Sequence, residues 1–266
     1  MSRQRPTVAD IRAMKGKYQF TMIRVETLDE LEAAEKAGID MVSVPPEMMV
    51  LPHFREVAPS LFAVPGVNFF EVGTAGDFVR WAFRLFTASA DAVYCSASLA
   101  TVKRLADEAI PVIGHVGLIP SRATWTGGFK AVGKSAESAL GIFEAVKAYE
   151  AAGAFGAEIE VVPTEVAAAI SERTSLFMVS MGAGTGCDCQ YLFGDDLLGQ
   201  NRGHVPRHAK AYRNFSDEFD RLQRERIAAF SEFAADVRSG AYPEQRHVVG
   251  IEAGELHRFL ESLAVS

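Results

Sequence analysis

Residues 157–181, AEIEVVPTEVAAAISERTSLFMVSM, contain the pattern that decides the fold. The runs 157–162 and 176–181 are almost continuously apolar, which is typical of strands that are covered on both faces, as in a parallel sheet. Between them, residues 164–171 have the pattern of a short helix. The segment is therefore predicted to be a strand–helix–strand unit of a parallel sheet.

The same alternation extends over most of the chain. Further strands are predicted at 18–25, 40–44, 67–72, 91–97, 111–117 and 190–193, and further helices at 77–87, 99–108 and 136–152. Thr27 and Glu30 match a capping box at the start of another helix, which Gly38 ends. Eight strands that alternate with helices predict an α/β fold, the (β/α)8 TIM barrel, which needs about 250 residues.

After Asp196 the pattern contains only helices, at about 217–238 and 252–263. No linker rich in Pro, Ser or Gly separates them from the barrel, and they show no second core. We therefore expect residues 1–266 to form a single barrel domain, in which residues 200–266 are C-terminal helices that cap the barrel or mediate oligomerisation.

Composition excludes several classes of partner. The chain has 27 Lys and Arg against 34 Asp and Glu, a net charge of −7, and an acidic surface lacks the electrostatic footprint of a nucleic-acid binder. No apolar run approaches the roughly 18 residues of a membrane span. The three cysteines, Cys95, Cys187 and Cys189, form neither a disulfide framework nor a four-ligand zinc site. These features predict a cytoplasmic protein that binds a small molecule.

In a barrel of this kind, chemistry belongs at the carboxyl ends of the strands. The candidates there are Arg24, Glu26, Pro46, Glu47, Glu71, residues 94–96, His115, Glu160 and the turn 182–188.

His115 lies in a glycine-rich turn, residues 114–121, where little side-chain bulk would hinder a ligand. An imidazole there suits a donor to a developing oxyanion or a general acid–base, although a histidine bonded into the barrel rim would look the same. The loop 126–134, with Lys130 and Lys134, would either close over a substrate or simply connect two elements.

Glu158 and Glu160 are two positions apart in a strand, so both side chains point to the same side, into the barrel. Burial raises the pKa of a carboxyl group, which makes a buried glutamate a plausible base near neutral pH. The alternative is that an interior Lys or Arg neutralises both groups. The glycines of 182–186 resemble a phosphate cradle, but the nucleotide-binding motifs are missing.

Taken together, these segments resemble the ketopantoate hydroxymethyltransferase family. The resemblance covers about residues 18–247 and is carried by 22–23, 37–40, 111–121, 127–134, 160–163, 181–184, 187–190, 196–199, 203–206 and 239–243. It implies a TIM barrel, a pocket for a 2-oxo acid, a homo-oligomer that is often a decamer, and Glu160 as a proton-transfer residue. It also leaves open whether a tetrahydrofolate donates the one-carbon unit.

The chain departs from the family at the positions that the resemblance implies for a Mg²⁺ site. Pro46 stands where the second strand supplies a ligand, and Glu71 keeps a carboxylate at the position of the third-strand ligand. Tyr94 and Ser96 replace a substrate-binding lysine and an acidic residue. Magnesium needs oxygen ligands, usually carboxylates, so the inherited Mg²⁺ site is expected to be lost. A displaced site at Glu71 and Glu47 stays open.

Two classes of function remain. The first is a divergent hydroxymethyltransferase-like or aldolase-like enzyme, which forms or cleaves a C–C bond of a small 2-oxo acid or a related carbonyl compound. The second is a catalytically degraded barrel that binds a ligand or serves assembly. For the enzyme we expect no metal ligands, catalytic roles for Glu160 and His115, and substrate contacts by Arg24, Glu26, Glu47, Glu71, Tyr94 and Ser96.

Overall fold

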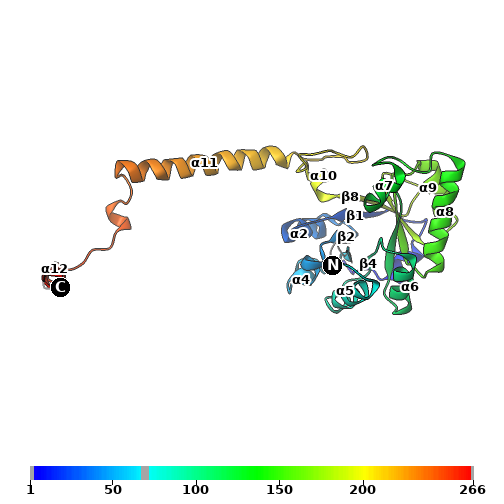
Figure 1. Cartoon of the computed structure of the whole chain (residues 1–266), viewed down its shortest axis with the longest axis horizontal. Coiled ribbons are helices and arrows are strands. Elements are labelled where there is room, and N and C mark those ends of the chain that lie inside the picture. The colour runs from blue at the N-terminus through cyan, green and yellow to red at the C-terminus, as the bar shows by residue number, and fades with distance from the viewer. Residues whose placement is uncertain (1–2, 67–71, 265–266) are drawn as a thin grey trace. The chain divides into compact units, whose positions relative to one another are not determined.

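The computed structural model describes residues 3–66 and 72–264 (Figure 1). Its sheet contains eight parallel strands: β1 (Phe20–Arg24), β2 (Met41–Val44), β3 (Phe62–Pro65), β4 (Val93–Tyr94), β5 (Val112–Gly117), β6 (Gly156–Glu160), β7 (Phe177–Met181) and β8 (Cys189–Phe193). The strand order is β3-β2-β1-β8-β7-β6-β5-β4. A single bridge between Gly66 and Tyr94 joins the two edges, so the sheet forms a nearly closed barrel. The predicted barrel fold is confirmed.

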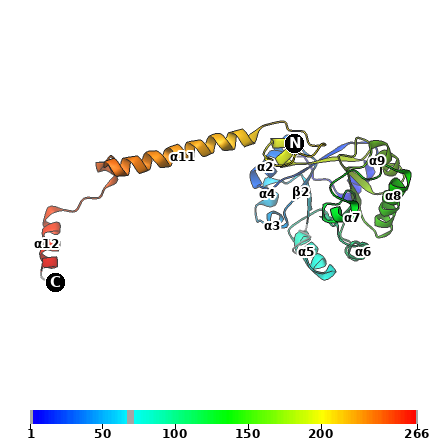
Figure 2. The same cartoon turned by 45° about the horizontal axis from the view of Figure 1, so that its top comes forward.

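Helices follow most strands and lie outside the sheet, as both views show (Figures 1 and 2). The described helices are α1 (Val8–Ala13), α2 (Leu28–Ala37), α3 (Pro46–Met49), α4 (Phe54–Val57), α5 (Ala75–Thr87), α6 (Leu99–Asp107), α7 (Ala123–Thr126), α8 (Ala136–Ala151), α9 (Thr164–Ser171), α10 (Gly194–Leu198), α11 (Phe215–Ser239) and α12 (Ala253–Ala264). One apolar cluster fills the space between the strands and helices α2 to α6, α8 and α9.

A second apolar cluster fills the amino-terminal part of the barrel interior. It includes Phe62, Phe155 and Phe177, and the last two rings stack with centroids 5.7 Å apart. Ile11 of α1 belongs to the same cluster, and nearby Lys15 is 2.7 Å from the buried carboxylate of Asp188. Aromatic side chains thus close the amino-terminal end of the barrel, and the cavity of the barrel lies at the carboxyl ends of the strands.

Two local predictions were wrong. The third strand lies at Phe62–Pro65, before the predicted range 67–72, of which 67–71 lie outside the described residues and Val72 is in no strand. The run that forms β3 is apolar but only four residues long, and it ends at a proline, a residue that is depleted in strands. At α2 the Thr27 hydroxyl accepts from the Glu30 N–H, but the Glu30 carboxylate accepts from the Glu26 N–H, so the capping box is only half formed.

The chain divides into two compact units, residues 1–213 and 214–266. The first contains the barrel. The second contains α11 and α12, which confirm the helices predicted near 217–238 and 252–263. That these helices cap the barrel or mediate oligomerisation stays a prediction. Among the described residues, no helix combines the length and apolar character that crossing a membrane requires.

Candidate active site

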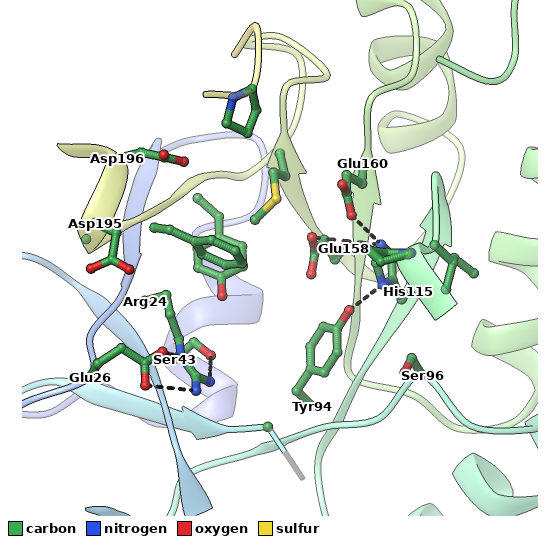
Figure 3. Close-up of a pocket in the computed structure, with 18 of the residues that line it drawn as sticks. Arg24, Glu26, Ser43, Tyr94, Ser96, His115, Glu158, Glu160, Asp195 and Asp196 are labelled. Carbon is green, nitrogen blue, oxygen red and sulfur yellow. Dashed lines mark hydrogen bonds and ion pairs between the residues drawn. The ribbon is translucent and has the colours of Figure 1, made fainter. Parts of the chain in front are cut away.

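A cavity of about 910 Å³ opens at the carboxyl ends of the strands. Seven of the eight strands, all except β3, contribute their last residue, or one within two positions of it, to a lining that also includes loop and helix residues. The predicted site residues in this lining are Arg24, Glu26, Glu47, Tyr94, Ser96, His115 and Glu160. Glu71 lies outside the described residues. The structure therefore brings together the predicted residues that it describes (Figure 3).

His115 and two glutamates form the most buried part of this cavity. Strands β5 and β6 are paired so that His115 lies opposite Glu158 and Gly117 opposite Glu160. The imidazole Nε2 is 3.0 Å from Oε2 of Glu160 and 3.9 Å from Oε1 of Glu158. On the other side of the ring, Nδ1 is hydrogen-bonded to the Tyr94 hydroxyl. The imidazole is thus fixed by Tyr94 and presents Nε2 to both carboxylates.

The charges of this cluster shift the pKa values of its members. Burial opposes the charged form of His115, but the negative charges of Glu158 and Glu160 together outweigh it and raise the pKa of the imidazole. Burial raises the pKa of Glu158, with His115 acting in the opposite direction. Burial and the nearby Glu158 raise the pKa of Tyr94 well above its usual value, so its hydroxyl stays a donor at neutral pH.

The buried glutamates are paired with a histidine, not with the interior Lys or Arg that the sequence analysis considered as an alternative. Within the part of the chain that the structure describes, their ion-pair partner is His115. The Nε2 atom is buried, yet it makes no hydrogen bond of acceptable geometry to a described residue. A nitrogen and two carboxylate oxygens, mutually within 4.8 Å, could hold a divalent cation, or could exchange protons with a ligand.

Across the cavity, Arg24 forms a second polar group (Figure 3). Its Nε donates to Oε1 of Glu26 at 2.6 Å, and its Nη1 donates to the Ser43 hydroxyl at 3.3 Å. Arg24 and Ser43 lie opposite each other in the β1–β2 pairing. Ser43 was not among the predicted residues, although its place near the end of the second strand is the signal that could have identified it.

Other lining residues were also missed. The sequence predicts that Glu158 faces the interior but not that it belongs to the site, and it does not predict the lining residues Tyr191, Asp195, Asp196 and His208. Asp195 and Asp196 lie two and three residues after the end of β8, so the rule that chemistry lies at strand ends would have included them. Burial and the neighbouring Glu30, Glu26 and Asp196 raise the pKa of Asp195.

The glycine-rich turns have packing functions. A Cβ at Gly114 would be 2.4 Å from the Tyr149 ring, and one at Gly184 would be 2.4 Å from Thr164. Gly114, beside His115, thus allows the close contact with α8, and the turn after β7 packs on α9. Asp188, at the end of that turn, was wrongly placed at the site, because it bonds to Lys15 and Gly16 at the opposite end of the barrel.

Phe129 in the loop 126–134 lines the cavity, whereas Lys130 and Lys134 do not. Closure of this loop over a substrate stays a prediction.

Comparison with known proteins gives consistent matches over most of the chain. The model of the family described as ketopantoate hydroxymethyltransferase matches residues 47–245. The 3-methyl-2-oxobutanoate hydroxymethyltransferase of Nitratidesulfovibrio vulgaris strain DP4 is 31% identical over 97% of this chain and 89% of its own length. The protein of the same name from Kosmotoga olearia is 30% identical over 88% of this chain and 94% of its own.

Among solved structures, phosphonopyruvate hydrolase matches with a TM-score of 0.51 and 15% identity, over 98% of this chain and 97% of its own. Its complex with oxalate and Mg²⁺ matches with a TM-score of 0.50 and 16% identity, over 98% of both chains. These structural matches support the barrel fold alone.

Proposed function

The chain belongs to the ketopantoate hydroxymethyltransferase family, and on this premise we propose that it is an enzyme that forms or cleaves a carbon–carbon bond beside the carbonyl group of a small 2-oxo acid. The observation that carries the proposal is the contact between Glu160 and His115, with Oε2 3.0 Å from Nε2, on the wall of the cavity. A carboxylate beside an imidazole is the arrangement needed to remove a proton next to a polarised carbonyl.

The magnesium ion that the family resemblance implies does not fit the residues at its expected ligand positions. Pro46, at the start of α3, has no side-chain donor, and Ser96 offers only a neutral hydroxyl. Glu47 is exposed, and Glu71 lies outside the described residues. The proposed proton transfers therefore involve only the chain's own groups.

In the first step, the Glu160 carboxylate takes a proton from the carbon next to the carbonyl of the 2-oxo acid. The electron pair of the broken C–H bond forms the enolate, whose negative charge lies on the carbonyl oxygen. In this proposal the Tyr94 hydroxyl is the donor to Nδ1 of His115, so the neutral imidazole carries its proton on Nε2 and stabilises that oxygen by donating a hydrogen bond to it, without transferring the proton.

In the second step, the enolate carbon bonds to the carbon of a carbonyl-type electrophile, and the proton held by Glu160 neutralises the new alkoxide. Cleavage is the same sequence in reverse. A tetrahydrofolate that carries a one-carbon unit is the donor implied by the family resemblance, and it stays a proposal here.

The first step can be tested without knowing the electrophile. The purified chain is incubated with 2-oxoisovalerate, pyruvate or 2-oxobutyrate in D₂O, and loss of the C3 proton signal is followed by NMR. We expect exchange of at least one acid to be well above the buffer rate. If no acid in the panel exchanges faster than in buffer, the chain is not an enolising enzyme, and the ligand-binding or assembly alternative replaces this proposal.

A further inference from the structure

Strands β2 and β3 end in residues that cannot ligate a metal. Their pairing places Val44 opposite Pro65, and Pro45 and Pro46 follow β2 directly. Proline side chains carry no oxygen or nitrogen donor, whereas a divalent cation such as Mg²⁺ needs several oxygen ligands. Within the described residues, the carboxylate close in sequence to these two strand ends is the exposed Glu47, which follows Pro46, and neither strand end itself supplies one.

A fixed positive charge lies at the same place. The Arg24 guanidinium extends from the end of β1 across the neighbouring strand, where Nη1 is 3.3 Å from the Ser43 hydroxyl. The same atom would be 3.8 Å from a Cβ at Gly66, the residue that follows β3. The guanidinium thus spans the ends of β1, β2 and β3, and its charge disfavours a cation there and favours an anion.

The guanidinium also has donors to spare. Three of its five N–H groups have described partners, with Nε and Nη2 directed to the two Glu26 oxygens at 2.6 and 3.5 Å and Nη1 directed to Ser43. One N–H on each terminal nitrogen is left for a ligand. Two parallel N–H groups at the end of a guanidinium match the two oxygens of a carboxylate.

Tyr94 links this group to the acid–base cluster. Its Cβ and ring are 3.8 Å from the same Gly66 Cβ position that Arg24 approaches, and its hydroxyl is bonded to His115. The Tyr94 side chain therefore lies between the Arg24 guanidinium and the His115 imidazole. A small acid bound to Arg24 would occupy the same cavity as the imidazole.

We propose that Arg24 takes the place of the divalent cation in this pocket: it binds the carboxylate of the 2-oxo acid directly, so substrate binding requires no metal. The substrate class rests on the proposed function, but the anion site rests on Arg24, Ser43 and the prolines. Glu26 holds the guanidinium in place through the two bonds at Nε and Nη2, and Ser43 orients Nη1.

Isothermal titration calorimetry tests this assignment. The chain is titrated with 2-oxoisovalerate and with isovalerate, which lacks the oxo group, in buffer with EDTA and in buffer with Mg²⁺ or Mn²⁺. We expect the same affinity for 2-oxoisovalerate in both buffers. Arg24→Gln should weaken binding by about 10- to 100-fold, as expected for losing charge-assisted hydrogen bonds, and Arg24→Lys should recover part of it.

The control is Arg173→Gln, which alters an exposed arginine that does not line the cavity and should leave the affinity unchanged. Melting curves of each variant establish that the barrel is folded. Affinity that appears only with a divalent ion, or that Arg24→Gln leaves unchanged, overturns the proposal while leaving the 2-oxo acid function in place. If isovalerate binds as tightly as 2-oxoisovalerate through Arg24, the anion site stands and the 2-oxo acid specificity fails. No binding of either acid overturns both.

Discussion

Nε2 of His115 lies 3.0 Å from Oε2 of Glu160 on the adjacent strand, although the two residues are not paired across the strands. His115 is paired with Glu158, two positions before Glu160. The register sets this contact, since Gly117 lies opposite Glu160. Gly117 has φ +90°, and a Cβ there would be 2.3 Å from the Glu160 carbonyl oxygen. Glycine at 117 therefore allows β5 and β6 to pair closely enough for the imidazole to reach the carboxylate.

The first prediction concerns Glu160 as the base. Glu160→Gln keeps the size of the side chain but cannot accept the C3 proton, so deuterium exchange into the active 2-oxo acid should fall by about 10²- to 10⁴-fold. Ligand affinity and melting temperature should stay near those of the unchanged chain. Glu172→Gln, at an exposed carboxylate, is the matched control.

A structural role for Glu160 predicts the opposite order of effects. If Glu160 only anchored the barrel, Glu160→Gln would lower the melting temperature first, and exchange would follow the remaining folded fraction. Normal exchange in this variant would remove Glu160 from the mechanism.

The second prediction concerns pH and stability. The pKa of Glu158 is raised above its usual 4.5 by burial, and that of His115 above its usual 6.5 because the two carboxylates outweigh burial. The folded chain thus binds these protons more tightly than the unfolded chain. Their contribution to stability is complete below the unfolded pKa values and is lost as pH rises through the folded ones. Tyr94 and Tyr191, which also face Glu158, have raised pKa values and stay neutral.

Urea unfolding between about pH 5 and pH 8 measures this loss. In Glu158→Gln one titrating group is gone and His115 loses a nearby negative charge, so the free energy of unfolding should decline less with rising pH than in the unchanged chain. Equal slopes for the two proteins would show that the cluster does not titrate in this range.

The barrel and the buried, inward-facing positions of Glu158 and Glu160 could be predicted because both depend on local pattern. Apolar runs identify strands covered on two faces, and the spacing of Glu158 and Glu160 places both side chains in the interior. The position of β3 could not be read in this way, since the run 62–65 is short and ends at Pro65. The role of Ser43 could be identified only from the β1–β2 register, which pairs it with Arg24. The sequence around Ser43 does not distinguish it from a serine with no contact to the site.

The third prediction concerns the metal. Because Pro46 and Ser96 replace the expected ligands and Arg24 lies at the neighbouring strand ends, we expect no tightly bound Mg²⁺ at the family's position. Metal analysis of the purified chain and calorimetric titration with Mg²⁺ measure this. A single tight site that Glu71→Ala abolishes would contradict the prediction. A tight site for a transition metal that Glu158→Gln abolishes would instead belong to His115, Glu158 and Glu160.

The last prediction is that the chain has little or no ketopantoate hydroxymethyltransferase activity. The family resemblance implies that Mg²⁺ and a lysine stabilise the enolate, and this chain has Pro46 and Tyr94 at positions that supply them. Losing even one such stabilising group typically costs about 10²- to 10³-fold in rate, and a tyrosine hydroxyl that already bonds to His115 does not restore a positive charge.

Growth of a pantothenate auxotroph that lacks its own hydroxymethyltransferase measures this activity, with the Nitratidesulfovibrio vulgaris relative as the positive control. We expect the relative to restore growth and this chain to fail at the same expression level. The exchange experiment in D₂O separates the causes of such failure. Exchange without growth means that the barrel enolises a 2-oxo acid but does not complete the family reaction, which is expected if the Glu160–His115 pair removes the proton as proposed. Growth at ordinary expression would mean that Arg24 and His115 compensate for the missing metal and lysine in the family reaction itself.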